Sequence, residues 1–325
     1  MTPLERALRD RIKAEGSLSV EAFMEACNNY YYATRDPLGA VGDFTTAPEI
    51  SQMFGELVGA CLADAWRKAG APDDAIYAEL GPGRGTLAAD ALRVLRSARY
   101  AGEVHLVETS PVLRKIQEQA VPTASFHEAV GDLPREPLLL VANEFLDALP
   151  VRQFVGGIER RVIAAGGGLA FDRDGDIVED SPARSETVAV IAERLRGDGG
   201  VALAIDYGHA EGAAGDTLQA VRRHKFSPVL DRPGEQDLTA HVDFEQVARS
   251  ARDAGAAVTT VLNQGEWLIR LGIEARAQAL SRANPDRADN VAAALHRLTS
   301  QEEMGRLFKV IAIHSPDWPV PAGFE

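Results

Sequence analysis

Three glycines directly after a predicted strand constrain the fold of this chain more than any other feature. An apolar, β-like run over residues 75–80 leads into Gly81, Gly83 and Gly85, and a helical pattern follows over residues 86–96. A strand, a glycine turn and a helix in this order bring backbone close to a nucleotide-like ligand in α/β proteins. The segment therefore predicts an α/β fold with a ligand at the carboxyl end of the first sheet strand.

The spacing of the glycines and two carboxylates indicate which ligand this is. A dinucleotide fingerprint needs glycine at its first, third and sixth positions, and the sixth position here is Thr86. Glu79, two residues before the first glycine, would repel a pyrophosphate and attract a cation. Glu108 ends the next predicted strand, where a carboxylate can bind ribose hydroxyls. These residues favour S-adenosylmethionine, and an NAD-dependent oxidoreductase is the weaker alternative.

The composition bounds the class of protein. The 325 residues are 46% hydrophobic, enough for one large α/β domain with additions or for two coupled domains. The net charge of -14 argues against a general nucleic-acid binder. Cys27 and Cys61 lie beside apolar residues and are expected to be buried thiols, and the seven histidines have no metal-ligand spacing, so no metal is predicted.

The location is predicted from two further patterns. The N-terminus lacks the apolar region of a secretory signal, and no apolar run reaches the length of a membrane span. We therefore expect a cytoplasmic enzyme of bacterial type without stable membrane insertion, with a processed organelle protein as the alternative.

Strand and helix patterns alternate along most of the chain, which predicts a doubly wound, mostly parallel sheet covered on both faces. Strands are expected at residues 75–80, 104–108, 124–127, 138–142, 201–205, 258–262 and 308–313. Helices are expected at residues 4–15, 20–28, 50–66, 86–96, 110–119, 243–254, 267–282 and 289–298.

Several segments depart from this alternation. Residues 29–44 are expected to form an aromatic-rich loop, and Thr46 and Glu49 have the spacing of a capping box. Residues 151–180 indicate a β-hairpin insertion, and the polar stretch 218–241 indicates a functional lid or a disordered loop. The predicted division is an N-terminal helical region over residues 1–70, with a loop on the cofactor and acceptor side, and a cofactor-binding domain over residues 71–325.

A polar segment follows the fourth predicted strand of the sheet. Asn143 and Glu144 come after five apolar positions, and Asp147 follows three residues later. A carboxylate suits a guanidinium because the planar fork of arginine pairs with two oxygens. Glu144, with Asp147, is therefore a candidate holder of an arginine acceptor. The alternative is a helix start, with Asn143 as its N-cap and Glu144 in its first turn.

These motifs are similar to the signature of the MidA-type methyltransferases. The similarity lies in residues 42–56, 79–87, 143–150, 205–208 and 237–244, in the same order over nearly the whole chain. It implies a class I S-adenosylmethionine fold, with a seven-stranded sheet whose last strand is antiparallel. It also implies methylation of a protein arginine, for instance in a subunit of respiratory complex I, because the family includes a complex I assembly factor.

The residues and the resemblance together predict a protein arginine methyltransferase. The expected catalytic residues are Asn143, Glu144 and Asp147. The expected cofactor-binding residues are Glu79, Gly81, Gly83, Gly85 and Glu108, with Thr46 and Pro48 from a block that folds over the cofactor or acceptor channel. The alternative function is an assembly factor that acts by binding a protein partner and keeps a residual S-adenosylmethionine site. The acceptor, the number of methyl groups and the oligomeric state stay open.

Overall fold

The computed structural model describes residues 1–34, 46–212 and 215–325. In these residues the main sheet contains the following strands: β2 (Ile76–Leu80), β3 (Val104–Val107), β4 (Ala124–His127), β5 (Leu138–Asn143), β11 (Gly200–His209), β15 (Val242–Asp243), β16 (Ala257–Val258), β17 (Leu262–Asn263) and β18 (Phe308–His314). The order is β16-β18-β11-β5-β2-β3-β4, with β15 and β17 paired beside this path.

The strand directions confirm the predicted class I fold. Strands β4, β3, β2, β5 and β11 run parallel to their neighbours, whereas the last strand, β18, is antiparallel to β11. The strand expected over residues 258–262 is instead two short strands that pair with different parts of β18. Between them, the Thr259 hydroxyl accepts a hydrogen bond from the Ala312 N–H and so replaces a backbone partner.

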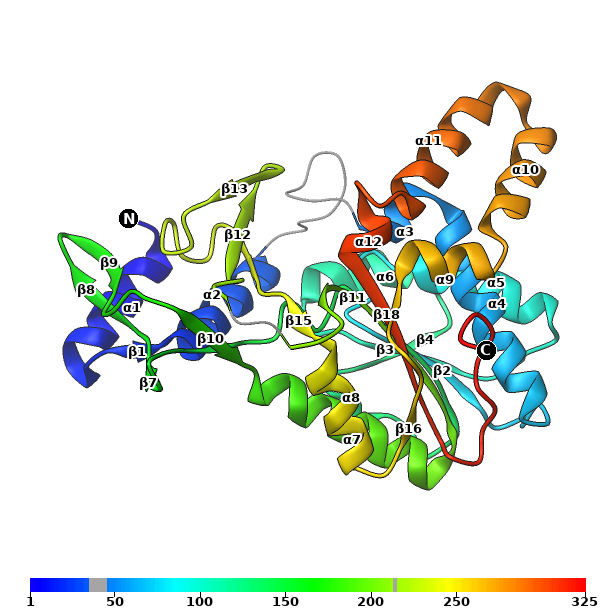
Figure 1. The fold of residues 1–325 in the computed structure, drawn as a ribbon, viewed down its shortest axis with the longest axis horizontal. Coiled ribbons are helices and arrows are strands. Elements are labelled where there is room, and N and C mark those ends of the chain that lie inside the picture. Colours follow the sequence, from blue (N-terminus) through cyan, green and yellow to red (C-terminus); the bar gives the residue numbers. More distant parts are fainter. Residues whose placement is uncertain (35–45, 213–214) are drawn as a thin grey trace.

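Helices cover both faces of the main sheet (Figure 1). One layer contains α4 (Gln52–Lys68), α5 (Thr86–Ser97) and α9 (Gln264–Arg270), and the other contains α7 (Pro182–Asp198) and α8 (Phe244–Asp253). Helix α10 (Ile273–Ala283) packs against α4 and α9. Neighbouring strand residues alternate between the layers, since Tyr77 packs in the first core and Ala78 in the second. The other helices of this part are α3 (Ala47–Ile50), α6 (Pro111–Ala120), α11 (Ala288–Thr299) and α12 (Met304–Leu307).

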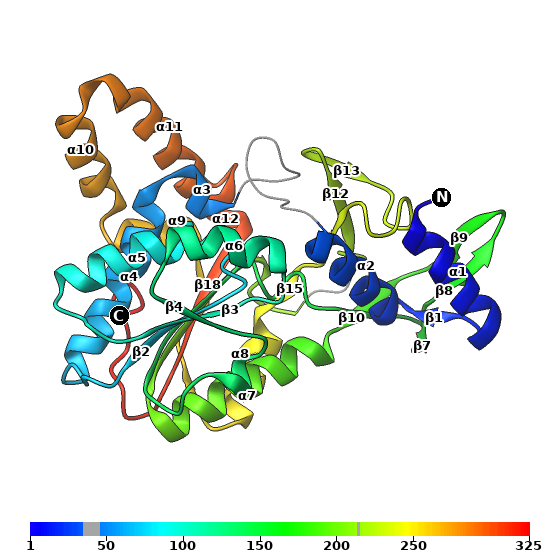
Figure 2. The ribbon, with the colours of Figure 1, turned by 180° about the vertical axis from the view of Figure 1, so that it is seen from behind.

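A smaller lobe lies beside the main sheet (Figure 2). It contains α1 (Pro3–Glu15), α2 (Val20–Thr34), β1 (Leu18–Ser19), β6 (Arg152–Val155), β7 (Ile158–Glu159), β8 (Arg161–Ala165), β9 (Gly168–Phe171), β10 (Ile177–Asp180), β12 (Gln219–Arg222), β13 (Lys225–Ser227) and β14 (Asp237–Thr239). Its strands form three small sheets. Leu8, Phe23, Val162 and Leu238 share its core, so the lobe joins the N-terminus to both insertions. Residues 1–70 therefore contribute α1 and α2 to the small lobe and α4 to the main layer.

The two insertions differ in how well they were predicted. The hairpins β6–β7 and β8–β9 confirm the β-hairpin insertion over residues 151–180. The prediction of a lid or disordered loop over residues 218–241 is wrong, because β12, β13 and β14 form a sheet there. Ala220 and Leu238 of that sheet are buried in the small core, which fixes it in place.

Three helical details also correct the predictions. Residues 30–32 belong to α2 and not to a loop, because Tyr31 is fully buried on that helix, while residues 35–44 lie outside the described part. The predicted capping box is absent: Thr46 makes no side-chain capping bond, and Glu49 accepts a hydrogen bond from Thr86. The helix expected over residues 267–282 divides at Gly272, whose φ of 88° lies in the left-handed region.

Candidate active site

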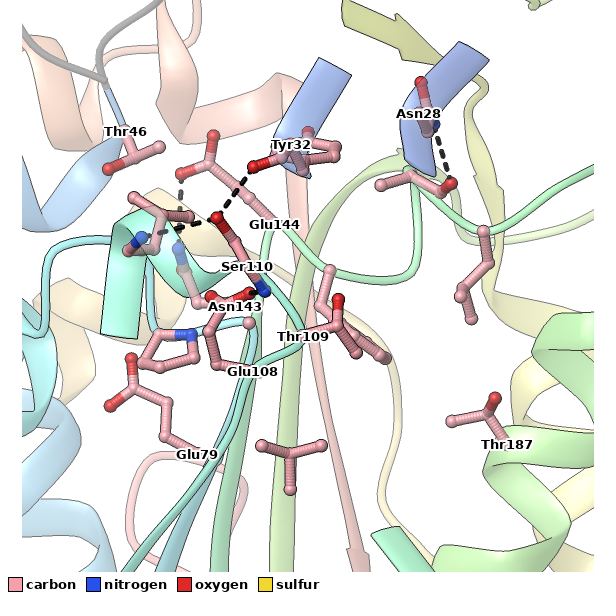
Figure 3. A pocket seen from close by; sticks show the side chains of 18 of the residues that line it. Asn28, Tyr32, Thr46, Glu79, Glu108, Thr109, Ser110, Asn143, Glu144 and Thr187 are labelled. Atoms are coloured by element: carbon pink, nitrogen blue, oxygen red, sulfur yellow. Dashed lines mark hydrogen bonds between the residues drawn. The ribbon is translucent and has the colours of Figure 1, made fainter. Parts of the chain in front are cut away.

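A cavity of about 620 Å³ opens at the carboxyl ends of β2, β3 and β5 and extends to α2 and α7 (Figure 3). Its charged lining is strongly acidic. The described residues that line it include seven glutamates and one arginine: Glu21, Glu25, Glu49, Glu79, Glu108, Glu128, Glu144 and Arg84. Such a lining favours cationic ligands, since opposite charges attract strongly in a partly enclosed site.

The glycine turn forms one end of the cavity. Gly81 and Gly83 line it, with φ values of 57° and 55° that suit glycine. A Cβ atom on Gly81 would lie 3.0 Å from the Phe145 ring, so the turn is closely packed. Gly85 does not line the cavity and instead begins α5 as its left-handed N-cap, with a φ of 79°.

Glu79 lies at the end of β2 and is almost completely buried. Its Oε2 accepts a hydrogen bond of 2.7 Å from the Tyr77 hydroxyl. Burial raises the pKa of the Glu79 carboxyl to about 8, against the effect of that hydrogen bond. The group is therefore mostly protonated at neutral pH and gains its charge when a cation approaches.

Glu108 follows β3 and is oriented by hydrogen bonds from residues near it. The Ser110 N–H donates to Oε1 at 2.7 Å, and Gln117 Nε2 donates to Oε2 at 3.1 Å. Burial raises the pKa of Glu108, while these hydrogen bonds lower it. Each carboxylate oxygen keeps a further lone pair, so this oriented group can accept two more hydrogen bonds.

Asn143 and Glu144 lie side by side on the cavity wall at the end of β5 (Figure 3). Glu144 Oε1 accepts from Asn143 Nδ2 at 3.2 Å and from the Ala47 N–H at 3.1 Å. Among the described residues, no donor reaches Glu144 Oε2, and Asn143 Oδ1 is buried without a hydrogen-bond partner. Burial raises the pKa of the Glu144 carboxyl to about 8. The pair therefore holds two oxygen acceptors that no described donor reaches, of which Asn143 Oδ1 is covered in this structure.

Asp147 is not brought to the cavity with Glu144. No helix begins at Asn143, so the alternative of a helix start is wrong, and a non-helical turn carries the chain away from β5. The Asp147 side chain is buried, and its Oδ1 has no hydrogen-bond partner. Burial raises the pKa of Asp147, whereas Tyr207 and Arg184 lower it.

Thr46 and Pro48, at the start of α3, line the cavity. Glu49 of the same helix also lines it and accepts a hydrogen bond of 2.5 Å from the Thr86 hydroxyl of α5. This bond ties the short helix to the end of the glycine turn.

Several cavity residues were missed by the sequence analysis. Three of them directly follow β4: Glu128, Ala129 and Val130. Ligands of α/β sheets lie at the carboxyl ends of strands, so the position of these residues could have predicted their place in the cavity. Tyr32 of α2 was missed because its helix was predicted to end too early. The Tyr32 carbonyl accepts from Ser110 Oγ at 2.7 Å (Figure 3). The Tyr32 hydroxyl donates to Asp237 at 2.7 Å. Tyr32 thus links α2 to the main sheet and to β14.

Metal-binding clusters and membrane-spanning helices are both absent from the described residues. No group of three or more histidine, cysteine, aspartate or glutamate side chains there is arranged to hold a metal ion. Within the same residues, no helix has both the length and the apolarity that a membrane span requires.

Comparisons with known proteins agree on a class of enzyme. A family model for S-adenosyl-L-methionine-dependent methyltransferases matches residues 57–169 and 159–262. The protein arginine methyltransferase NDUFAF7 homolog, mitochondrial, of Drosophila melanogaster is 36% identical, over 99% of this chain and 88% of its own. The human protein arginine methyltransferase NDUFAF7, mitochondrial, is 32% identical, over 96% of this chain and 83% of its own.

A solved structure supports the same class. The crystal structure of a COG1565 superfamily member from Burkholderia thailandensis, bound to S-adenosyl-homocysteine, superposes with a TM-score of 0.87. Its sequence is 28% identical, and the match covers 98% of this chain and 93% of that chain.

The relatives also correct one prediction. A cytoplasmic enzyme was expected, and the names of the curated relatives from fly and human contradict this, because they place those proteins in mitochondria.

Proposed function

This chain belongs to the family of S-adenosyl-L-methionine-dependent methyltransferases, and from that premise we propose that it methylates an arginine side chain of a protein. The observation that carries the proposal is that two cavity-lining residues, Asn143 and Glu144, each keep a side-chain oxygen that no described donor reaches. Relatives that are 32–36% identical over nearly the whole chain are named protein arginine methyltransferases, which supports the same acceptor.

The cavity residues suit the cofactor. Glu79 would hold its amino group and Glu108 its ribose hydroxyls, while Gly81 and Gly83 let the backbone come close. Thr46 and Pro48 would cover it from α3. When bound, S-adenosylmethionine supplies a methyl group on a sulfonium, so the chain mainly has to orient the acceptor.

Glu144 would bind and orient the acceptor guanidinium. A planar guanidinium presents several N–H donors in a fixed fork, and Glu144 Oε2 and Asn143 Oδ1 are acceptors that can take them. The guanidinium must lose a proton as its nitrogen gains a methyl group. Burial raises the pKa of the Glu144 carboxyl to about 8, and the charge of the bound guanidinium favours its ionised form, which can accept that proton.

The partner is a protein whose arginine reaches the cavity from the side of α2 and α7. A subunit of respiratory complex I is the proposed partner, because the sequence resembles a family that includes a complex I assembly factor. The carboxylates of Glu21 and Glu25 on α2 support a basic acceptor segment.

The test is methyl transfer to the proteins of the source organism. An extract of a strain that lacks the gene is incubated with the purified chain and methyl-labelled S-adenosylmethionine, and the labelled amino acid is identified after hydrolysis. We expect methylarginine in one or a few proteins. Glu144→Gln should reduce the rate by about 100-fold or more, the usual contribution of a general base, with the affinity for S-adenosylhomocysteine kept.

Glu118→Gln is the matched control, because Glu118 is exposed on α6. Full transfer by Glu144→Gln would remove that residue from the mechanism. Absence of methylarginine with the parent chain would favour the alternative function, assembly by protein binding alone.

A further inference from the structure

The turn after β5 has an unusual backbone at its first residue. Glu144 has a φ of 49°, in the left-handed region that residues other than glycine rarely adopt. Such a conformation persists only where the surrounding structure fixes it. The Glu144 N–H donates to the Ile205 carbonyl at 2.9 Å, but this one bond fixes only the near end of the turn.

Asp206 holds the turn from the side of β11. It is completely buried, and its Oδ2 accepts hydrogen bonds from the N–H groups of Phe145, Leu146 and Asp147, at 3.2, 2.9 and 3.2 Å. Its Oδ1 accepts from the Tyr207 N–H at 2.9 Å. Three consecutive N–H groups therefore converge on one carboxylate oxygen.

Arg184 holds the same turn from α7. Its guanidinium is buried, and Nε donates to the Leu146 carbonyl at 2.6 Å. Its other nitrogens donate to the carbonyls of Ala240 and His241, both at 2.7 Å, and to that of Asp147 at 3.4 Å. The turn is thus bound through its N–H groups by Asp206 and through its carbonyls by Arg184.

We propose that Asp206 and Arg184 form a polar clamp that positions Glu144 for the methyl transfer. The proposal rests on the proposed role of Glu144. Neither clamp residue lines the cavity, so both act through the backbone of the turn and are positioning residues. Because Arg184 also binds the carbonyls of residues 240–241, the clamp sets the orientation of Glu144 relative to the chain that leaves β14.

The first test measures the turn itself and needs no acceptor. In Asp206→Asn, we expect faster hydrogen exchange at the amides of Phe145, Leu146 and Asp147. A crystal structure of this variant with S-adenosylhomocysteine should show Glu144 at a negative φ. Unchanged exchange together with an unchanged Glu144 backbone would overturn the proposal, whether or not the chain methylates arginine.

The second test measures the coupling to Glu144 by methyl transfer. Asp206→Asn should lower kcat by about tenfold or more, because small misplacements of a reacting group are costly, with the KM for S-adenosylmethionine kept. In a Glu144→Gln background the same change should have little further effect. An equal drop of kcat in both backgrounds would overturn the coupling.

Arg184 supplies a second variant and a matched control. Arg184→Met should lower kcat, and Arg184→Lys, which keeps one donor group, should restore part of it. Arg194 is also buried on α7 but donates to the carbonyls of Leu133 and Pro134, away from the turn. Arg194→Met should lower stability and leave exchange at residues 145–147 as in the parent. Faster exchange there in Arg194→Met, or no rescue by Arg184→Lys, would overturn the proposal.

Discussion

The carboxylate of Glu108 is already oriented in the folded chain by Ser110 and Gln117. If this carboxylate binds the ribose hydroxyls, Glu108→Ala removes two hydrogen-bond acceptors that are already oriented before the cofactor binds. Since a hydrogen bond to a charged group contributes about 1.5–3 kcal/mol, we expect the affinity for S-adenosylmethionine to fall by about 10- to 100-fold. Calorimetric titration measures this. Glu118→Ala, on the exposed face of α6, should bind as the parent does, and equal binding by Glu108→Ala would contradict the ribose assignment.

Glu144 lines the cavity as a candidate site residue should, whereas Asp147 does not, and this difference could not be predicted from the sequence. Residue types and their places after strands were enough to place Glu79, Glu108, Asn143 and Glu144 on one cavity. The spacing of three residues between Glu144 and Asp147 puts both on one face only if a helix forms. The clamp holds a turn there instead of a helix. The carboxylate that binds the N–H groups of this turn, Asp206, lies on a different strand, and the sequence alone does not reveal that contact.

At the scale of elements, α2 turns one face toward the cavity. Glu21, Glu25, Asn28, Asn29 and Tyr32 line it at the spacing of a single helical face. From Tyr32 to Glu21 the helix axis extends about 16 Å, so the two glutamates lie far from the glycine turn along α2. We therefore expect them to contact the acceptor protein rather than the cofactor.

The double change Glu21→Gln with Glu25→Gln should raise the KM for the acceptor by several-fold, about tenfold at low ionic strength, and leave kcat and cofactor affinity near the parent values. Steady-state kinetics at two salt concentrations measure this. The matched control, Glu15→Gln with Glu118→Gln, removes the same charge from exposed positions on α1 and α6. A similar rise of KM in the control would mean a general charge effect and not a local contact.

The elements that sequence reasoning missed share a physical cause. Helix α7 was not predicted, because buried Arg184 and Arg194 interrupt the apolar periodicity of its inner face. The sheet of β12, β13 and β14 was missed because strands of three or four residues in a polar, proline-containing stretch give little alternation. Long apolar strands such as β5 and β18 were predicted closely, since their pattern is local.

For the whole molecule, buried carboxyls predict how stability depends on pH. The folded chain raises the pKa of Glu79 and Glu144 from an ordinary value of 4.5 to about 8. The fold therefore favours their protonated forms, and this contribution is complete below pH 4.5 and is lost as the pH rises through 8. Each group can change the free energy of unfolding by up to about 1.4 kcal/mol per pH unit in this window.

We expect the free energy of unfolding, measured by chemical denaturation, to fall between pH 6 and pH 8. Glu79→Gln with Glu144→Gln should flatten this dependence. Saturating S-adenosylhomocysteine should also reduce the slope, because its amino group favours the ionised form of Glu79. A parent chain whose stability rises over this range would contradict the assignment.

The small lobe has a consequence for how the chain reaches its folded state. Its core joins Leu8 and Phe23 to Leu238, and the Thr2 hydroxyl donates to the Pro233 carbonyl, 231 positions along the chain. Helices α1 and α2 thus cannot complete the core of the small lobe until the chain has been synthesised as far as Leu238. Contacts of such long sequence separation form slowly. Until then, part of the apolar surface of α1 and α2 stays exposed on the nascent chain, and exposed apolar surface favours misassembly and chaperone binding.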